Sequence, residues 1–401
     1  MKIFLGFTDV ANVTANYAKG FKALGHEVFS VAWRRSQFYP DSEYDLVIDD
    51  RIPEKNNDNF LSTYLKIIIQ LAKLVKSLKC DLFIMYAPAV LPTKLYYPIL
   101  KTLGKKIITA FWGSDIRYWH AFAEEMKHLG VEDEVAPFFQ YAKGRSGGGY
   151  LDKKRTIEVA EKYSDLIISQ PDSAQLQTRP YMRCNIPLDM SQYQFYIPGR
   201  IKPLILHAPS VPTAKGTDIV LGVINELRDE KLEFEFRLVE KMPNNQLRDL
   251  LTDSDIVIDQ IYSATIAGLS AEAMATGNAV LARYMSDYCK VPSGCPVINV
   301  NKFTLKDSLR QIILNVEQRK KLAELGRPYV ESVNDHIKIC GDLLRWLEEK
   351  DNIHYDFHPA FNTTYQIPES VLQNEKKETI KRRLNFYKTL LSANQLKYIK
   401  N

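Results

Sequence analysis

The sequence predicts an α/β protein in which two Rossmann-like domains face each other across a cleft. Two observations lead to this prediction. In the first third of the chain, short apolar segments alternate with segments whose apolar residues recur at helical spacing, and a second series of the same kind begins after Pro198 and Gly199. Such alternation favours a doubly wound parallel sheet, because a crossover between parallel strands is nearly always right-handed.

The first predicted domain spans residues 1–198. Its strands are expected at residues 2–7, 27–32, 45–48, 81–86 and 106–111. A strand that is buried on both faces of a sheet needs no polar alternation, which explains adjacent apolar residues such as Ile107 and Ile108. Helices are expected at residues 17–24, before Gly25, and at residues 63–78.

The second predicted domain spans residues 199–350, and a tail of residues 351–401 follows it. We expect strands at residues 204–207, 233–239, 256–259, 279–283 and 297–300, and helices at residues 218–228, 244–251, 268–275 and 305–325. Ligands of doubly wound sheets bind beyond the carboxyl ends of the strands, so two facing domains are expected to hold the site between them.

The composition is typical of a globular protein. Hydrophobic residues make up 45% of the 401 residues and charged residues 25%, which excludes a largely disordered chain, a collagen and a disulfide-stapled miniprotein. The net charge of +5 is too small to indicate a nucleic-acid partner. The chain opens with a predicted strand rather than a signal peptide, and no uncharged apolar stretch reaches the roughly 18 residues of a membrane span. The five cysteines form no C-x-x-C pair, so we expect reduced thiols, no zinc site and a cytoplasmic protein.

Lys215 is the first candidate site residue. It follows the predicted strand 204–207 and precedes Gly216 and a predicted helix, for which Thr217 or Asp218 could be the N-cap. A lysine at this position faces the carboxyl edge of the sheet, where it could pair with a diphosphate. The alternative is a solvated lysine at the start of a helix.

A second candidate site follows the predicted strand 256–259. A loop of small residues leads into a short helix that starts at Gly268 and stops at Gly277, and small residues let a ligand approach the backbone closely. The free N–H groups and the positive end of the helix dipole suit an anion. Glu272 lies about one turn into this helix, where its carboxylate could accept hydrogen bonds from two ribose hydroxyls. The alternative is an exposed glutamate on an ordinary helix.

Together these segments resemble the retaining glycosyltransferases of the GT-B fold, in the large family four. That family has a lysine–glycine pair, then a glycine-containing loop, then an L-x-x-E-A-M-A-x-G helix, and here residues 269–277 read L-S-A-E-A-M-A-T-G. Residues 113–117, which read G-S-D-I-R, resemble the family's H-G-S-D-x-R loop. Residues 318–347 look like its closing helices, so the resemblance covers nearly the whole chain.

The resemblance implies transfer of a sugar from a nucleotide-sugar donor to a glycan or lipid-linked acceptor, with retained configuration. Lys215 would neutralise the diphosphate, and Glu272 would bind the donor ribose. The backbone around Ala267, Gly268 and Leu269 would stabilise the leaving phosphate, because fixed donors hold its developing charge without reorganising.

No metal or other cofactor is expected in such a site, because the lysine and the helix N–H groups replace the charge of a metal ion. Asp253 and Asp255 spell a D-x-D sequence, but they precede a predicted core strand. We therefore do not expect them to bind a metal.

Three residues of the first domain complete the candidate site. Asp115 could accept a hydrogen bond from a sugar hydroxyl, which makes it a candidate catalytic residue together with Lys215; alternatively, it forms an Asx-turn that shapes its loop. Ala11 and Asn12 follow the first predicted strand and are expected near the donor phosphates.

The sequence departs from the family pattern at three places. Ala264 stands where the family has its first glutamate, and Trp112 stands where it has a histidine. Pro209 and Ser210 stand where a basic residue is usual. Each change removes a polar contact near the sugar or the phosphates, and the fold tolerates these losses more readily than catalysis does.

Two alternatives to a transferase therefore stay open. One is a nucleotide-sugar epimerase of the same fold, and the other is a catalytically degenerate protein that binds a sugar nucleotide or a partner. The tail also allows two interpretations. Its basic residues between positions 376 and 388 could dock on an anionic membrane surface, or the tail could pack back on the first domain.

Overall fold

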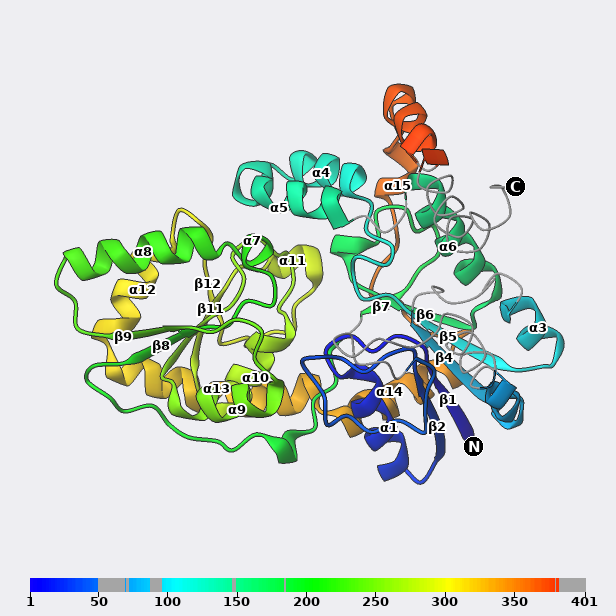
Figure 1. Ribbon diagram of the computed structural model, residues 1–401, viewed down its shortest axis with the longest axis horizontal. Coiled ribbons are helices and arrows are strands. Elements are labelled where there is room, and N and C mark those ends of the chain that lie inside the picture. Colours follow the sequence, from blue (N-terminus) through cyan, green and yellow to red (C-terminus); the bar gives the residue numbers. More distant parts are fainter. Residues whose placement is uncertain are drawn as a thin grey trace, which may run out of the picture.

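The computed structural model describes residues 1–49, 69, 72–86, 96–145, 149–183, 185–378, 380 and 381. Within these residues it confirms the predicted fold class, since two parallel sheets, each covered by helices, stand next to each other (Figure 1). Half of the helix predicted at residues 63–78 and the tail beyond residue 381 lie outside the described residues.

The N-terminal sheet has the strand order β3-β2-β1-β4-β5-β6-β7. Its strands are β1 (Lys2–Gly6), β2 (Glu27–Ala32), β3 (Leu46–Val47), β4 (Leu82–Tyr86), β5 (Lys106–Ala110), β6 (Leu166–Ser169) and β7 (Met182–Arg183). The central strands are buried on both faces, as their continuous apolar sequences require. The order reverses between β1 and β4, so the loop that follows β1 starts at a switch point.

The helices of the N-terminal domain lie on both faces of this sheet. They are α1 (Val13–Ala23), the 3-10 turn η1 (Leu74–Lys79), α3 (Tyr96–Thr102), α4 (Trp119–His128), α5 (Glu132–Arg145) and α6 (Tyr150–Tyr163). α1 begins four residues before the predicted helix, because Asp9 accepts a hydrogen bond from the N–H of Thr14 (3.2 Å) and so stabilises the first turn.

The C-terminal sheet has the order β12-β11-β10-β8-β9, and its switch point lies between β8 and β10. Its strands are β8 (Leu204–His207), β9 (Glu235–Leu238), β10 (Ile256–Ile258), β11 (Ala279–Ala282) and β12 (Ile298–Asn299). Its helices are α7 (Pro212–Lys215), α8 (Thr217–Asp229), α9 (Asn244–Asp253), α10 (Gly268–Thr276), α11 (Ser286–Cys289), α12 (Leu305–Leu314) and α13 (Val316–Asn334). The single helix predicted at residues 305–325 is in fact α12 and α13, because Asn315 leaves the helical conformation and caps α13.

The last long helix, α14 (His336–Glu348), packs on α1 of the N-terminal domain, towards which it extends in Figure 1. Its residues Ile339 and Leu343 join the core of that domain. Gly20 of α1 makes the close approach possible, since a Cβ there would lie 2.5 Å from the carbonyl oxygen of His336. By its packing, α14 therefore lies with the N-terminal domain rather than with the predicted domain of residues 199–350.

The described part of the tail also contacts the N-terminal domain. The ring of Phe357 stacks on Tyr181 at a centroid distance of 5.1 Å, and the short helix α15 (Phe361–Thr364) follows. The Glu375 carboxylate accepts hydrogen bonds from the Tyr118 hydroxyl (2.7 Å) and the Tyr150 N–H (2.6 Å). These contacts hold the tail against the starts of α4 and α6, which follow the loop after β5, and against the residue that precedes β7.

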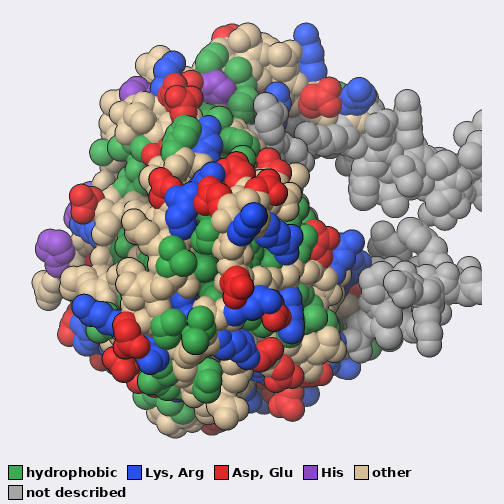
Figure 2. Space-filling view, turned by 90° about the vertical axis from the view of Figure 1, so that its left-hand side faces the viewer, with side chains coloured by type: hydrophobic (Ala, Val, Ile, Leu, Met, Phe, Trp, Pro, Cys, Tyr) green, Lys and Arg blue, Asp and Glu red, His purple; other side chains and the backbone are tan. Residues whose placement is uncertain are grey.

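Figure 2 faces the outer end of the C-terminal domain, where positive and negative side chains are interspersed. Part of this mixture is a set of ion pairs between α12 and α8, in which Lys306 and Arg310 both contact Glu230. Within the described part of the chain, no helix combines the length and the apolar character that crossing a membrane requires.

Candidate active site

A cavity of about 300 Å³ lies between the two domains. The C-terminal domain contributes the loops that follow β8 and β10, the two strands at its switch point. The N-terminal domain contributes the loop after β5, including Gly113, Ser114 and Arg117. The cavity thus lies where a doubly wound sheet is expected to bind its ligand.

Lys215 lines this cavity at the end of α7. Gly216 follows in the left-handed conformation (φ 74°), and a Cβ at that position would lie 2.4 Å from the Ile261 side chain. The turn therefore requires glycine, and it points Lys215 back towards the end of β10. There the lysine Nζ lies 2.7 Å from Asp259 Oδ1 and 3.1 Å from Gln260 Oε1. The predicted cation is present, and its charge is paired with a carboxylate that the sequence analysis did not single out.

Asp259 links Lys215 to the start of α10. Its side chain is fully buried, and its Oδ2 accepts hydrogen bonds from the Ser270 N–H (3.2 Å) and the Ser270 hydroxyl (2.8 Å). The N–H groups of Gly268 and Leu269 have no acceptor among the described residues, as is usual for the first residues of a helix. The lysine and this helix N-terminus therefore form one positively polarised wall of the cavity. Asp259 already accepts hydrogen bonds from two of its donors, the Lys215 Nζ and the Ser270 N–H.

The predicted phosphate-binding backbone lies at this wall. Ala267 is the N-cap residue of α10 and lines the cavity, and Gly268 and Leu269 form the first turn of the helix. Ala267 makes no side-chain capping bond. The N-terminal N–H groups are thus left to an external acceptor or to water.

Glu272 is buried, in contrast to the exposed glutamate of the alternative interpretation. It is 4% exposed and does not line the cavity. Its Oε1 accepts hydrogen bonds from the Tyr193 hydroxyl (3.0 Å) and the Asn244 side chain (2.9 Å). Burial raises the pKa of Glu272 to about 7, against these hydrogen bonds, which favour the ionised form.

Asp115 lies in the loop after β5, and its carboxylate is buried although part of the residue is exposed. It accepts hydrogen bonds from the N–H groups of Trp112 (3.0 Å), Gly113 (2.8 Å) and Ile116 (3.0 Å). Burial raises its pKa, while these hydrogen bonds act in the opposite direction. The carboxylate is therefore engaged within its own loop, which favours the loop-shaping interpretation.

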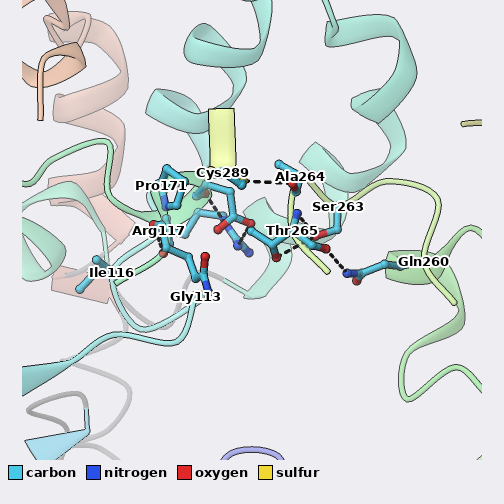
Figure 3. A network of polar contacts seen from close by, with 12 residues as sticks. Gly113, Ile116, Arg117, Pro171, Gln260, Ser263, Ala264, Thr265 and Cys289 are labelled. Atoms are coloured by element: carbon cyan, nitrogen blue, oxygen red, sulfur yellow. Dashed lines mark hydrogen bonds and ion pairs between the residues drawn. The ribbon is translucent and has the colours of Figure 1, made fainter. Parts of the chain in front are cut away.

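Arg117 is the charged residue of this loop that lines the cavity. Its guanidinium pairs with Asp172 at 2.5 Å and lies over the rings of Phe122 (5.4 Å) and Phe138 (5.3 Å). Figure 3 shows Arg117 and Gly113 on one side and the loop with Ser263 and Thr265 on the other. The two domains thus present opposed polar loops to the same space.

The position at which the resemblance expects a glutamate is packed and apolar. Ala264 is 1% exposed, and its carbonyl accepts hydrogen bonds from the N–H of Met285 (2.9 Å) and the thiol of Cys289 (3.0 Å). Ser263 and Thr265, on either side, line the cavity. Together with Gln260, they are the polar side chains that the loop after β10 presents to the cavity.

Ala11 and Asn12 follow β1 and both adopt the left-handed conformation, with φ values of 52° and 61°. Asn12 lines a second cavity, also of about 300 Å³, together with Tyr39, Asn244 and Arg248. The structure therefore brings Lys215 and the start of α10 together in one cavity. Asn12 lies outside the lining of the first cavity, and it shares the second cavity with Asn244, whose side chain bonds to Glu272.

Comparisons with known proteins bear on the fold. No family model matches the chain, and no curated protein matches it. Among solved structures, HepE from Anabaena in complex with UDP-glucose has a TM-score of 0.53 at 11% identity, covering 87% of this chain and 99% of that one. An alpha-glucosyltransferase in complex with UDP and DNA has a TM-score of 0.54 at 11% identity, covering 86% and 99%. Sucrose-phosphate synthase from Thermosynechococcus elongatus has a TM-score of 0.52 at 12% identity, covering 87% and 100%.

The chain has the GT-B fold. At these identities the likeness shows the fold alone, so the assignment of site residues depends on the geometry above. Asp259, which pairs with Lys215, and Tyr193, which bonds to Glu272, were not predicted from the sequence, and neither was Tyr39, which lines the second cavity. Asp259 could have been noticed, because it ends a predicted strand at the carboxyl edge of the sheet. Tyr39 and Tyr193 gave no signal, since each is distant in sequence from Glu272.

Proposed function

We propose that this protein is a glycosyltransferase that moves a sugar from a nucleotide-sugar donor to a glycan or lipid-linked acceptor, with retention and without a metal ion. One observation carries the proposal. Lys215 and the N-terminus of α10 lie at the wall of one interdomain cavity, at the switch point of the C-terminal sheet. Both features favour a diphosphate there, and the opposed loop after β5 leaves room for an acceptor.

The proposed reaction breaks the bond between the anomeric carbon and the phosphate oxygen of the donor. The acceptor hydroxyl forms the new bond, and its proton leaves with the nucleoside diphosphate. Lys215 and the N–H groups of Gly268 and Leu269 would hold the charge that develops on the leaving phosphate. Asp259 would keep the lysine aligned, because it bonds both Lys215 and Ser270.

The remaining residues take supporting roles in this proposal. Asp115 shapes the loop that presents Ser114 and Arg117 to the acceptor side of the cavity. Glu272 binds the donor ribose, and Asn12 lies on the far side of that nucleoside end. The protein would act at the cytoplasmic side of the cell, with its basic tail available to an anionic membrane surface.

A second candidate function is a degenerate GT-B protein that binds a sugar nucleotide or a partner without turnover. Ala264 favours it, because this buried alanine leaves no carboxylate at the position where the resemblance expects one. An epimerase of the same fold would instead isomerise the sugar of a free donor.

A donor screen separates the three functions. The purified protein is incubated with UDP-, GDP- and ADP-linked sugars, and both the released nucleoside diphosphate and the identity of the sugar are followed by NMR. A transferase releases the diphosphate slowly with water as acceptor, an epimerase changes the sugar and leaves the donor intact, and a binding protein does neither. Lys306→Ala serves as a control that should match wild type, since Lys306 lies on the outer face of the C-terminal domain. Absence of release and of isomerisation with every donor would contradict the transferase proposal.

A further inference from the structure

The two domains also meet through a helical hairpin, α4 and α5, that belongs to the N-terminal domain. α5 lies beside α7 of the C-terminal domain (Figure 1). The Phe138 ring of α5 packs against the core of that domain and also lines the cavity. On α4, Glu125 accepts a hydrogen bond from the Tyr288 hydroxyl of α11 (2.7 Å). The hairpin therefore contacts the C-terminal domain directly beside the proposed active site.

Arg283, which directly follows β11, is buried at this interface. Its side chain is 3% exposed. Its Nε and Nη2 both lie 2.7 Å from Oε2 of Glu134, in the first turn of α5. Its Nη1 donates to the carbonyl oxygen of Ser263 (2.9 Å). One guanidinium thus joins a carboxylate of the N-terminal domain to the loop after β10, and its fork of fixed donors suits this double contact.

The loop after β10, residues 260–267, carries polar side chains that line the cavity. The Gln260 side chain donates to the carbonyl oxygen of Thr265 (2.9 Å) (Figure 3), and the Thr265 N–H donates to the Ser263 hydroxyl (3.1 Å). These bonds shape the loop internally, whereas the bond from Arg283 anchors it to the end of β11. Because a peptide group is planar, holding its carbonyl oxygen fixes the direction in which the neighbouring side chains leave the backbone.

The burial of Arg283 makes its two partners depend on each other. A guanidinium does not lose its charge, and burying it costs free energy unless a counterion and hydrogen-bond acceptors compensate. Glu134 is the carboxylate that pairs with it, and this carboxylate comes from the other domain. If the domains separated, the guanidinium would lose this counterion, and turning towards water would take it away from the Ser263 carbonyl.

We infer that Arg283 is a positioning residue of the proposed active site. It holds the loop of residues 260–267 in the form that presents its polar side chains to the cavity, and it does so only while Glu134 pairs with it. The inference rests on the proposed function, which assigns this cavity to the donor. Contact between the domains and the shape of the sugar side of the site are thereby coupled through one side chain.

The first test measures the order of the loop in Glu134→Ala and in a matched control, Asp133→Ala. Asp133 is the neighbouring, exposed acid in the first turn of α5, so both variants lose the same favourable charge at the helix N-terminus. Hydrogen exchange is followed for residues 260–267 and for the Met285 N–H, which donates to the Ala264 carbonyl. We expect about tenfold faster exchange there in Glu134→Ala and no change in Asp133→Ala or in β8.

The second test compares turnover with nucleotide affinity. With a nucleotide sugar that wild type hydrolyses, kcat should fall by about tenfold in Glu134→Ala, because the polar groups proposed to face the sugar are misplaced. The calorimetric affinity for the nucleoside diphosphate should change by less than about twofold, since Asp259 and Gln260 still hold Lys215. Arg283→Lys keeps the charge but replaces the fork by one ammonium group, so it should show the same split.

The results separate the inference from the function on which it rests. Loop exchange that is equal in Glu134→Ala and wild type would overturn the inference, and so would equally fast exchange in Asp133→Ala. A loss of nucleoside diphosphate affinity as large as the loss of kcat would also overturn it, because the damage would then extend beyond the loop. Failure of wild type to release the diphosphate from every donor would overturn the proposed function, and loop exchange alone would then decide whether Arg283 and Glu134 order the loop.

Discussion

The two ends of the interdomain cleft are built differently. At the cavity end, Lys215 is held by Asp259 and Gln260, and all of these contacts lie within the C-terminal domain. At the end that contains Glu272, the N–H of Asn244 donates to the carbonyl oxygen of Phe38, so this contact crosses from one domain to the other. The proposed phosphate site is therefore held by contacts within one domain, whereas the proposed nucleoside site also depends on contacts between the domains.

The largest expected effect comes from disrupting the preorganised end. Lys215→Ala removes the cation that pairs with Asp259. The Asp259 side chain is 0% exposed, and among the described contacts its carboxylate bonds only to Lys215 and Ser270, so the variant leaves a buried charge without a counterion. Breaking a buried ion pair on one side costs about 3–5 kcal/mol of unfolding free energy. Donor turnover should also fall by about 2–4 kcal/mol in transition-state stabilisation. Thermal or urea unfolding and single-turnover release of the diphosphate measure the two effects.

A double variant separates stability from function at this end. Lys215→Met combined with Asp259→Asn leaves no unpaired charge, so most of the lost stability should return. Turnover should stay low, because the cation that faces the phosphate is still missing. Recovery of turnover together with stability would show that Lys215 only holds the fold.

The second prediction concerns the pH dependence of the Glu272 end. Because burial raises the pKa of Glu272 to about 7 from the usual 4.5, the folded state holds this proton at pH values where the unfolded chain has lost it. The contribution to stability is therefore favourable at low pH, falls as the pH rises from about 4.5 to 7 and then stays constant, by on the order of 3 kcal/mol in all.

Glu272→Gln isolates this contribution, because glutamine keeps the shape and can accept from Tyr193 and Asn244 without titrating. The measurement is urea unfolding at several pH values, expressed as the difference between variant and wild type. The variant should gain relative stability between pH 4.5 and 7. A difference in unfolding free energy that does not change with pH would mean that the Glu272 carboxylate is solvated rather than buried.

These two regions also show which parts of the candidate site could be predicted from the sequence. The positions of Lys215 and of α10 could be predicted, because a lysine–glycine pair and an L-x-x-E-A-M-A-x-G run lie directly beside their strands. Local patterns fix such positions, since the strand, the turn and the helix are consecutive in the chain. The boundaries of most strands were predicted for the same reason, and β8 matches to the residue.

What the sequence could not give were contacts between distant segments. Asp259 and Lys215 are separated by 44 positions, and Phe38 and Asn244, whose backbones are hydrogen-bonded, belong to different domains. Nor could the packing of α14 on α1 be read from the chain, because an apolar helix face does not state which domain it covers. Gly20 is required by that contact, but this requirement becomes apparent only when His336 is known to pack against it.

A smaller effect is expected from the edge of the interface. Asn245→Ala removes the hydrogen bond to Asp41, which is exposed and so contributes about 0.5–1 kcal/mol. The free energy of unfolding, measured by urea denaturation, should fall by this amount. Gln246→Ala, at the next position of the same helix, is the control and should change the stability by less than about 0.5 kcal/mol. A loss above about 2 kcal/mol in Asn245→Ala would mean that the interface buries this hydrogen bond.

The smallest expected effect is that of a chelator. The D-x-D sequence does not face the cleft: it precedes β10, at the edge of the sheet opposite the carboxyl ends. Asp253 pairs with Arg200 (2.6 Å) and Arg237 (3.6 Å), and Asp255 accepts hydrogen bonds from Arg200 (3.2 Å) and the N–H of Leu204 (2.8 Å).

Carboxylates that are neutralised by arginines have little left to offer a hard cation, which needs several oxygen ligands. Both ends of the cleft would then work without a metal, and donor release measured in EDTA should equal release in its absence. Asp253→Asn should behave like wild type in the same assay, because the aspartate is part of a surface ion pair. Loss of release in EDTA, with recovery on adding magnesium or manganese, would show that the positive wall formed by Lys215 and α10 is insufficient for the diphosphate.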